Sequence, residues 1–393
     1  MTAMPIVDTD THLSEPPDLW VSRVSKKKWG DAVPHVVYDE RRGQEIWVIG
    51  DRRTAGVAGY AFAGWHEYPP NHPPTVAEAD PAAFDAGERV KRMNREGIVA
   101  EVLYANLLAF SMDAFMDLGD LELSMECVRA YNDFLVDFAS GAPDRFILQT
   151  TLPFWDVKAS VAEIERCHEL GHRGINFMTK PYKFGLPPIA DDHWEPILKT
   201  VEDLGVPVSF HTGYQGTFKE DWKRKMNGLQ SPTAYAKEVV MDLMGLVEGS
   251  TEVLFGGVCH RYPGLNFINV ESGFGWVPYL LESADWFWVN SGCHKEFPER
   301  ELPSFYYRRQ MYATFWFERE TVRQMGESFA DNLMFETDFP HPTSLSPGPV
   351  SNARPVREVV DDMLTYLPAD MCKKVLYENA ARLYGVDVPT TAS

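Results

Sequence analysis

The sequence predicts an α/β protein, a distorted (β/α)8 (TIM) barrel with loop insertions at the C-terminal mouth. Eight short apolar segments have the length of buried strands, at residues 5–11, 98–104, 146–152, 174–178, 206–211, 265–270, 311–317 and 333–337. Helix-like stretches separate most of them, and this alternation is typical of parallel βαβ units. Several of the segments end in a carboxylate or an imidazole. Catalytic residues of such barrels lie at the C-terminal ends of the strands.

The helix-like stretches have recognisable ends. Helices are predicted at residues 85–96, 121–139, 157–170, 194–204, 236–247, 276–288 and 371–384. Four of them stop immediately before a glycine, at Gly97, Gly171, Gly205 and Gly385. Glycine is favoured there because it adopts the left-handed conformation that ends many helices.

The chain is predicted to form one barrel domain over residues 1–386, followed by a loose tail at residues 387–393. A single barrel of about 250 residues can exceed 400 when loops are inserted. Two segments interrupt the regular alternation. Residues 40–95 begin with a hairpin pattern and continue through a stretch rich in proline, glycine and aromatic residues, which we interpret as a flap over the active site. Residues 213–235 are polar and glycine-rich, and we interpret them as a second loop insertion.

Charge and composition exclude several classes of protein. The formal net charge of −20 argues against binding to nucleic acid or to an anionic membrane. No apolar run approaches the length of a membrane span. The five cysteines include no CxxC pair, which argues against a cysteine zinc site. These features are typical of a cytoplasmic enzyme that acts on a small molecule.

Five side chains are candidate metal ligands because each lies at the end of a predicted strand. Two of them are only two residues apart, so their side chains point to the same face of a strand. Histidines and carboxylates at such positions can hold a divalent cation. Taken singly, each also fits a polar turn, a core histidine or a helix cap. The five are Asp10, His12, His211, Glu271 and Asp338.

The same strand ends supply candidate catalytic groups. Glu271 and Asp338 can act as acid or base as well as ligands, and His341 follows Asp338 closely enough to move protons. Aromatic residues in the loops and at the strand ends are candidates for contact with the substrate, and we expect Trp65, Tyr68, Tyr104, Tyr214 and Trp316 in this role.

Several motifs in the chain resemble the amidohydrolase-related family, which includes aminocarboxymuconate-semialdehyde decarboxylase. The first is Ile-Val-Asp-Thr-Asp-Thr-His-Leu-Ser-Glu-Pro near the N-terminus. Pro-Val-Ser-Phe-His-Thr-Gly at residues 207–213 and Phe-Glu-Thr-Asp-Phe-Pro-His at residues 335–341 follow in order. Asn-Ala-Ala-Arg-Leu-Tyr at residues 379–384 completes the set. The resemblance covers nearly everything from residue 5 to residue 386.

This resemblance implies a distorted barrel with a divalent metal at its mouth. It places Asp10 and His12 in the ligand pair of the first strand, His211 as the ligand of strand 5 and Asp338 as the ligand of strand 8. Two positions depart from the family pattern. Many members have His-x-His where this chain has Asp10-x-His12, and the decarboxylases have a histidine where this chain has Glu271. The carboxylate-rich set favours Mn or Fe over Zn, as one ion or as two.

Three functions remain open from the sequence. The first is a metal-dependent hydrolase of a C–N or C–C bond, or a decarboxylase, acting on a small carboxylated compound. The second is a binuclear Mn/Fe or di-iron oxygenase on the same scaffold. The third is a non-catalytic subunit that partners an active paralogue. The resemblance also implies a homo-oligomer.

Overall fold

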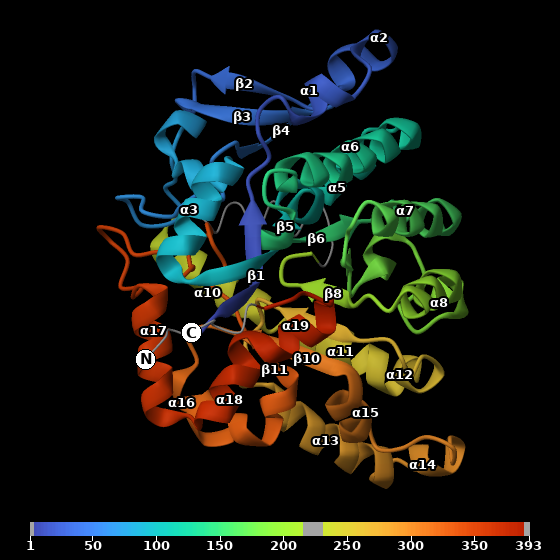
Figure 1. Cartoon of the computed structure of the whole chain (residues 1–393). Coiled ribbons are helices and arrows are strands. Elements are labelled where there is room, and N and C mark those ends of the chain that lie inside the picture. Colours follow the sequence, from blue (N-terminus) through green and yellow to red (C-terminus); the bar gives the residue numbers. More distant parts are fainter. Residues whose placement is uncertain (1–3, 215–230, 389–393) are drawn as a thin grey trace.

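Eight parallel strands form the barrel that the sequence predicts. The computed structural model describes residues 4–214 and 231–388 (Figure 1). In the eight-stranded sheet each strand pairs with its neighbours in the order of the chain. The strands are β1 (Ile6–Leu13), β5 (Ile98–Ala105), β6 (Phe146–Thr151), β7 (Gly174–Phe177), β8 (Val208–His211), β9 (Phe267–Val270), β10 (Met311–Phe315) and β11 (Leu333–Phe335). All eight predicted strands are therefore confirmed.

The barrel closes between its first strand and the segment that follows its last. Asp338 N donates to Asp10 O over 3.0 Å, and His12 N donates to Phe339 O over 2.7 Å. Thr11 and Phe339 also form an isolated parallel bridge. These contacts bring the two ends of the chain's ligand pattern side by side, although more than 300 residues separate them in sequence.

Helices surround the barrel and cover its outer face. The long helices begin and end close to the predicted positions, and Asp85 caps the first of them by accepting from Glu88 N over 2.8 Å. Gly97 and Gly205 follow two helices in the left-handed conformation, as expected. These helices are α3 (Ala86–Glu96), α6 (Leu121–Ala139), α7 (Val157–Glu169), α8 (Glu195–Leu204) and α13 (Val277–Asn290).

One helix prediction was wrong in its extent. A single helix was expected at residues 236–247, but α10 (Pro232–Leu243) and α11 (Leu246–Phe255) meet at Gly245. Glycine weakens a helix interior, so the helix breaks at this residue although the apolar pattern of the sequence continues through it. The helices α15 (Pro303–Gln310), α16 (Arg319–Met325) and α17 (Val356–Tyr366) were not anticipated.

The C-terminal helical segment closes the bottom of the barrel. Ala380 and Tyr384 of α19 (Asn379–Tyr384) pack in one cluster with Val7, Val102 and Met334 from the strands. In Figure 1 this helix lies across the end from which β1 starts. This cluster therefore packs apolar side chains into the end of the barrel opposite the mouth.

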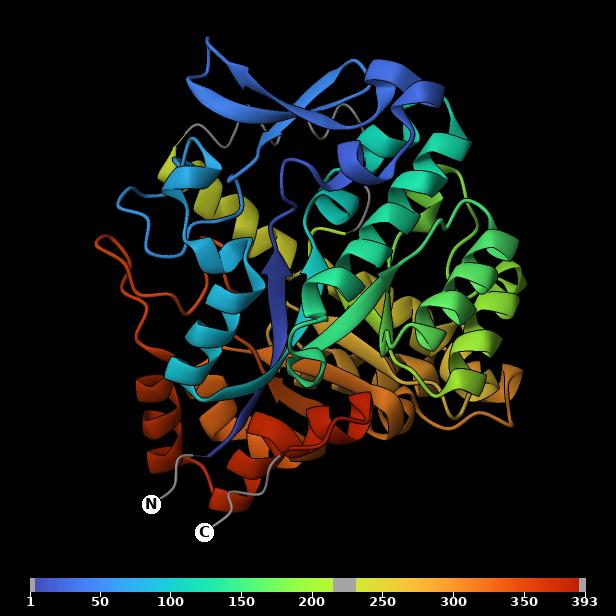
Figure 2. The same ribbon diagram turned by 45° about the horizontal axis from the view of Figure 1, so that its top comes forward.

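A small antiparallel sheet lies over that mouth. It consists of β2 (His35–Asp39), β3 (Gln44–Ile49) and β4 (Arg52–Gly56), in that order. The hairpin expected near residue 45 is β3–β4, and β2 adds a third strand that was not predicted. Figure 2 shows this sheet, in blue, at the end of the barrel toward which β1 points.

Two predicted segments lie partly outside the described residues. These are the loop insertion at residues 213–235, of which 215–230 are not described, and the end of the tail after residue 388. Within the described ranges, no helix combines the length and the apolar character needed to cross a bilayer.

Candidate metal centre

The five predicted ligands converge at the mouth of the barrel. His12 Nε2 lies 3.0 Å from His211 Nε2 and 3.4 Å from Asp10 Oδ1. His211 Nδ1 is 3.8 Å from Glu271 Oε2, and Asp338 Oδ1 is 3.8 Å from His12 Nε2. The five side chains come from β1, from the end of β8, from the residue after β9 and from the segment after β11. The fold thus brings together groups that the sequence scatters over the whole chain.

His341 joins this cluster. Its Nδ1 lies 2.8 Å from Asp338 Oδ1, and its ring stacks on His12 with the centroids 3.7 Å apart. On its other side, Nε2 hydrogen-bonds Asn106 Oδ1 over 2.8 Å. His341 therefore stands between the ligand cluster and the end of β5, with both ring nitrogens close to polar groups.

The backbone at two of the ligands is strained. Glu271 has φ of 54° and Asp338 has φ of 58°, and they are the non-glycine residues with positive φ in the described part of the chain. A non-glycine residue in this region costs roughly 1–3 kcal/mol and persists only where the surroundings impose it. Glu271 directly follows β9 and Asp338 comes three residues after the end of β11, so the turn that aims each carboxylate into the mouth is the source of the strain.

Burial and like charge set the protonation of the cluster. Burial, helped by Asp338, raises the pKa of both Asp10 and Glu271 well above the usual carboxyl range. Burial also lowers the pKa of His211 to about 4 and holds that of His12 well below its ordinary value. Neutral imidazoles are the form that binds metals, and a cation would relieve the crowding of carboxylates.

The donor set fits a divalent metal ion. Two overlapping groups each have four donor atoms within 4.8 Å of one another, and they share His12 and Glu271. One group adds Asp10 and His211, and the other adds Asp338 and His341. Asp10 Oδ2 is buried and, among the described residues, receives no hydrogen bond. A buried carboxylate oxygen without a donor is the kind of atom that a cation satisfies.

A second layer of buried charge holds the ligand-bearing segments. Glu101 on β5 accepts from Arg89 over 3.1 Å and from Arg92 over 2.6 Å. Arg89 Nη2 donates to His12 O over 2.6 Å, and Arg92 Nη2 donates to Thr337 Oγ1 over 3.3 Å. These bonds connect the ion-paired Arg89, Glu101 and Arg92 to the backbone of His12 and to Thr337, the residue before Asp338.

Asp8 makes a further link of the same kind. Its carboxylate accepts from Thr337 N over 2.9 Å and from Thr337 Oγ1 over 2.6 Å. Burial and the charge of Glu101 raise the pKa of Asp8 to about 8. Asp8 therefore ties β1 to the residue before Asp338 instead of joining the cluster.

A cavity of about 760 Å³ opens beside the cluster. Glu271 and His341 line its inner end, together with Phe110, which lies 5.7–5.9 Å ring to ring from His12, His211 and His341. Tyr60 stacks on Phe110 with the centroids 5.3 Å apart. The outer wall comes from the small sheet and from α10, and it includes Arg42, Gln44, Arg53, Thr54, His72, Tyr235, Glu238 and Asp242.

The aromatic residues expected to bind substrate lie elsewhere. None of the five is among the described residues that line this cavity. Tyr104 is buried in the barrel interior, where its hydroxyl pairs with Ser209 Oγ at 2.9 Å, and Tyr214 is also buried. Tyr68 is 60% exposed, and Trp65 lines an outer groove next to the cavity.

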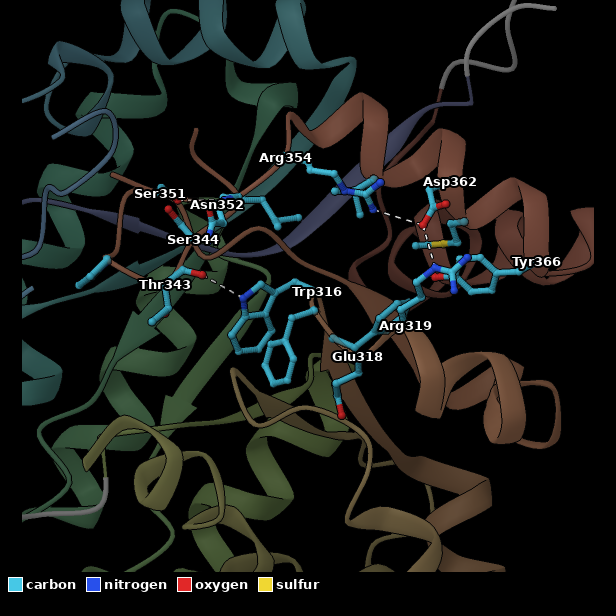
Figure 3. Close-up of a pocket in the computed structure, with 17 residues that line it drawn as sticks. Trp316, Glu318, Arg319, Thr343, Ser344, Ser351, Asn352, Arg354, Asp362 and Tyr366 are labelled. Carbon is cyan, nitrogen blue, oxygen red and sulfur yellow. Dashed lines mark hydrogen bonds and ion pairs between the residues drawn. The ribbon is translucent and has the colours of Figure 1, made fainter. Parts of the chain in front are cut away.

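Trp316 faces a different pocket. Its Nε1 donates to Thr343 O over 3.1 Å, and Figure 3 shows its indole among residues of the loops after β10 and β11. In the same pocket Arg319 and Arg354 both pair with Asp362. A residue at a strand end can thus turn away from the mouth, and its position in sequence does not reveal the direction.

Sequence reasoning missed Tyr60, Phe110 and Asn106. Tyr60 and Phe110 have no regular spacing from any ligand, and their approach depends on how the flap and the loop after β5 fold. Asn106 had a usable signal, because it is a polar residue close to the end of a predicted strand, as each candidate ligand is.

Comparisons with known proteins agree with this architecture. The family model described as "Amidohydrolase" matches residues 7–386. A curated γ-resorcylate decarboxylase from Rhizobium sp. (strain MTP-10005) is 27% identical over 270 residues, which cover 64% of this chain and 76% of the relative.

Solved structures share the fold. An amidohydrolase from Mycobacterium avium subsp. paratuberculosis K-10 superposes with a TM-score of 0.74 at 18% identity, over 98% of this chain and 100% of the other. A dihydroxybenzoic acid decarboxylase from Polaromonas sp. JS666, solved with bound manganese and the inhibitor 2-nitroresorcinol, gives 0.61 at 20% identity, over 97% of both chains. With the family model matching almost from end to end and the expected barrel in place, the chain belongs to the amidohydrolase family.

Proposed function

We propose that the protein is a metal-dependent decarboxylase of a small aromatic carboxylic acid. One observation carries the proposal: the buried cluster of Asp10, His12, His211, Glu271 and Asp338 opens into a cavity whose inner wall is aromatic. Polar donors can hold the carboxylate end of a substrate, while Phe110 and Tyr60 offer flat apolar surfaces to its ring. The likeness to γ-resorcylate decarboxylase supports the same reaction class.

The chain's own residues divide the work of this reaction. Asp10, His12, His211, Glu271 and Asp338 would hold the metal, which when bound supplies positive charge that neutralises and orients substrate oxygens. The bond between the ring and the carboxylate breaks, CO₂ leaves, and the ring carbon gains a proton. Glu271 and His341 line the cavity and are placed to deliver that proton. Phe110 covers three of the histidines and limits the access of water to them.

The test is CO₂ release from aromatic acids by protein loaded with one metal at a time. We expect turnover of 2,6-dihydroxybenzoate or 5-carboxyvanillate with Mn²⁺, and its loss in Glu271→Gln and His341→Gln. His294→Gln, on the exposed surface of α14 (Cys293–Glu296), is the matched control and should keep full activity. Absence of CO₂ release from every acid tested, with metal bound, would refute the proposal.

The oxygenase alternative has one structural observation in its favour. The two overlapping donor groups that share His12 and Glu271 offer room for two ions. Elemental analysis of the purified protein decides the number of ions per chain, and anaerobic assays decide whether O₂ is consumed. Turnover that stops without O₂ would favour the oxygenase, whereas hydrolysis of an amide or a ring without CO₂ release would favour the hydrolase.

A further inference from the structure

We propose that Glu336 is a positioning residue, which holds the backbone amide of Glu271 and thereby fixes the direction in which the Glu271 carboxylate enters the candidate metal centre. The inference deepens the proposed function and rests on it, because it takes Glu271 as a ligand of the metal. It assigns a role to a buried carboxylate that belongs to neither donor group found among the described residues.

Glu336 lies just after the last strand of the barrel and is fully buried. Its backbone N donates to Phe315 O over 3.2 Å, so the chain still runs beside β10 at this point. Met334, two residues earlier, packs in the apolar cluster of the barrel interior, and side chains two apart on an extended segment point to the same face. The Glu336 side chain therefore points into the barrel, where the charges of Asp10 and Asp338 act on it.

Two side chains accept from the backbone amide of Glu271. Glu271 N donates to Thr314 Oγ1 over 3.0 Å and to Glu336 Oε2 over 3.3 Å. Thr314 also hydrogen-bonds Glu336, so the two acceptors hold each other in place. The carbonyl is bonded as well, because Thr212 Oγ1 donates to Glu271 O over 2.7 Å. Both polar groups of the Glu271 backbone are thus bonded to side chains from neighbouring segments.

The ladder between β9 and β10 does not hold this amide. Their pairing ends at Asn269 and Ala313, and Glu271 comes after it with φ of 54°. A buried N–H requires an acceptor, and a strained backbone persists only where its surroundings impose it. Glu336 and Thr314 provide the acceptors at this residue, so their loss should release the turn that aims the Glu271 carboxylate.

The charge of Glu336 has no counter-charge of its own in the described part of the chain. Glu101, which is equally buried, pairs with Arg89 and Arg92. No lysine, arginine or histidine among the described residues forms an ion pair with Glu336, and its Oε1 receives no hydrogen bond from them. A buried carboxylate without a cation destabilises a fold, so support of the fold does not explain this residue. A divalent cation bound nearby would supply the missing charge.

Replacing Glu336 separates positioning from support of the fold. Glu336→Leu removes both the acceptor and the buried charge, so we expect the metal-free variant to be at least as stable in urea as the wild type. The same variant should bind Mn²⁺ about 10–100-fold more weakly, as is usual when a residue that orients a ligand is lost. Glu336→Gln keeps an oxygen that can accept from Glu271 N and should retain most of the affinity.

Two measurements on the full-length protein follow these changes without any substrate. Titration with Mn²⁺, followed by EPR, gives the affinity and shows whether the coordination of the ion changes. Hydrogen exchange of the segment 267–275 in the metal-free protein reports the Glu271 amide, which should exchange faster in Glu336→Leu and at the wild-type rate in Glu336→Gln.

Glu163→Leu is the matched control. Glu163 is a buried carboxylate of α7 that pairs with Arg166 at 2.6 Å. Its loss should lower the stability and leave the affinity for Mn²⁺ unchanged, which is the reverse of the result expected for Glu336→Leu.

Several outcomes overturn the role of Glu336. Unchanged Mn²⁺ affinity in Glu336→Leu would do so, and equal losses in the Leu and Gln variants would make charge the cause instead of the hydrogen bond. A metal-free Leu variant that is less stable than the wild type, or unfolded, would make Glu336 a structural residue. Absence of Mn²⁺ binding by the wild type would remove the metal centre on which both proposals rest.

The positioning role and the decarboxylase can fail separately. Weak Mn²⁺ binding in Glu336→Leu and tight binding in Glu336→Gln, without CO₂ release from any acid by the wild type, would support the positioning role and refute the decarboxylase. CO₂ release by the wild type, with wild-type Mn²⁺ affinity and exchange in Glu336→Leu, would do the reverse.

Discussion

Asn106 Oδ1 accepts a hydrogen bond from His341 Nε2 over 2.8 Å, and this contact determines which nitrogen of His341 faces the metal cluster. The amide is oriented by a second bond, because Asn106 Nδ2 donates to Leu13 O over 3.3 Å. A carbonyl oxygen only accepts, so Nε2 carries the hydrogen. Nδ1 is then the nitrogen that lies 2.8 Å from Asp338 Oδ1.

Replacing Asn106 should therefore impair the site more than the fold. We expect Asn106→Leu to lower kcat or metal content by about 10–100-fold, as is usual when a residue that orients a ligand is lost. Asn106→Asp keeps an acceptor at the same place and should retain most of the activity. Turnover, metal per chain and ¹⁵N shifts of labelled histidines in the Zn-loaded protein measure the effect, since the shifts report which ring nitrogen bears hydrogen.

Asn132 provides the matched control for this prediction. It is equally buried, but its amide bonds Thr151 O and Glu163 Oε1 on the outer layer of the barrel. Asn132→Leu should reduce stability and leave the His341 signals in place. If Asn106→Leu leaves these signals and kcat unchanged, the tautomer is determined by another group.

The positive φ at Glu271 predicts an unusual order of stability. Glu271→Gly and Glu271→Ala both remove the carboxylate, and we expect both to lose metal and activity. At φ of 54° an L residue costs about 1–2 kcal/mol that glycine does not, so the glycine variant should be the more stable by about 1 kcal/mol. Urea unfolding of the metal-free variants measures the difference.

An exposed helical position gives the opposite order and serves as the comparison. Glu282 lies within α13 and is exposed, and there Gly is expected to be less stable than Ala by about 1 kcal/mol. If Glu271→Gly is instead less stable than Glu271→Ala, the backbone at Glu271 is not strained.

The convergence of the five candidate ligands could be predicted from the sequence, whereas the residues that line the cavity beside them could not. Each candidate ligand lies in the C-terminal part of an apolar strand or shortly after it, and in a parallel barrel that local pattern alone places it at the mouth. The cavity depends on how the flap packs against α10 and on which way each ring turns. Tyr104 ends a strand as His12 does, yet its hydroxyl pairs with Ser209 inside the barrel.

Long-range contacts escaped prediction for the same reason. Glu101 was one polar residue within a predicted strand, and nothing near it in the sequence identifies Arg89 and Arg92 as its partners. Asn106 follows the same strand, but its significance comes from His341, which lies 235 residues further along the chain. Local patterns predict elements and their ends, and pairs between distant loops require the folded chain.

The buried network under the mouth predicts a large loss of stability when its charge is removed. Glu101→Gln would leave Arg89 and Arg92 buried without their carboxylate, and we expect a cost of about 3–5 kcal/mol. Glu96 also pairs with Arg92, at 2.9 Å, but its side chain is 23% exposed. Glu96→Gln should cost about 0–1 kcal/mol. Similar losses in the two variants, measured by urea unfolding, would show that burial of the Glu101 pair is not what matters.

Glu15 predicts a pH dependence of stability with a sign unusual for a carboxylate. Burial raises its pKa from 4.5 to about 7, although its Oε1 accepts from Asn106 N and Leu107 N. The carboxyl group of Glu15 therefore binds its proton more tightly in the folded protein than in the unfolded chain. Below pH 4.5 both states are protonated and there is no cost. Between pH 4.5 and 7 the cost of ionising the buried group grows, and above 7 it stays at roughly 3 kcal/mol.

Glu15→Gln removes this ionisation and keeps a carbonyl oxygen that can accept from the same two amides. The variant should match the wild type near pH 4.5 and exceed its free energy of unfolding by about 3 kcal/mol at pH 8. Urea titrations of the metal-free proteins at several pH values measure the difference, and comparing the two curves cancels every other group that titrates. A difference that is constant with pH would mean that folding leaves the pKa of Glu15 unchanged, and one that shrinks as the pH rises would mean that its folded-state pKa is lowered.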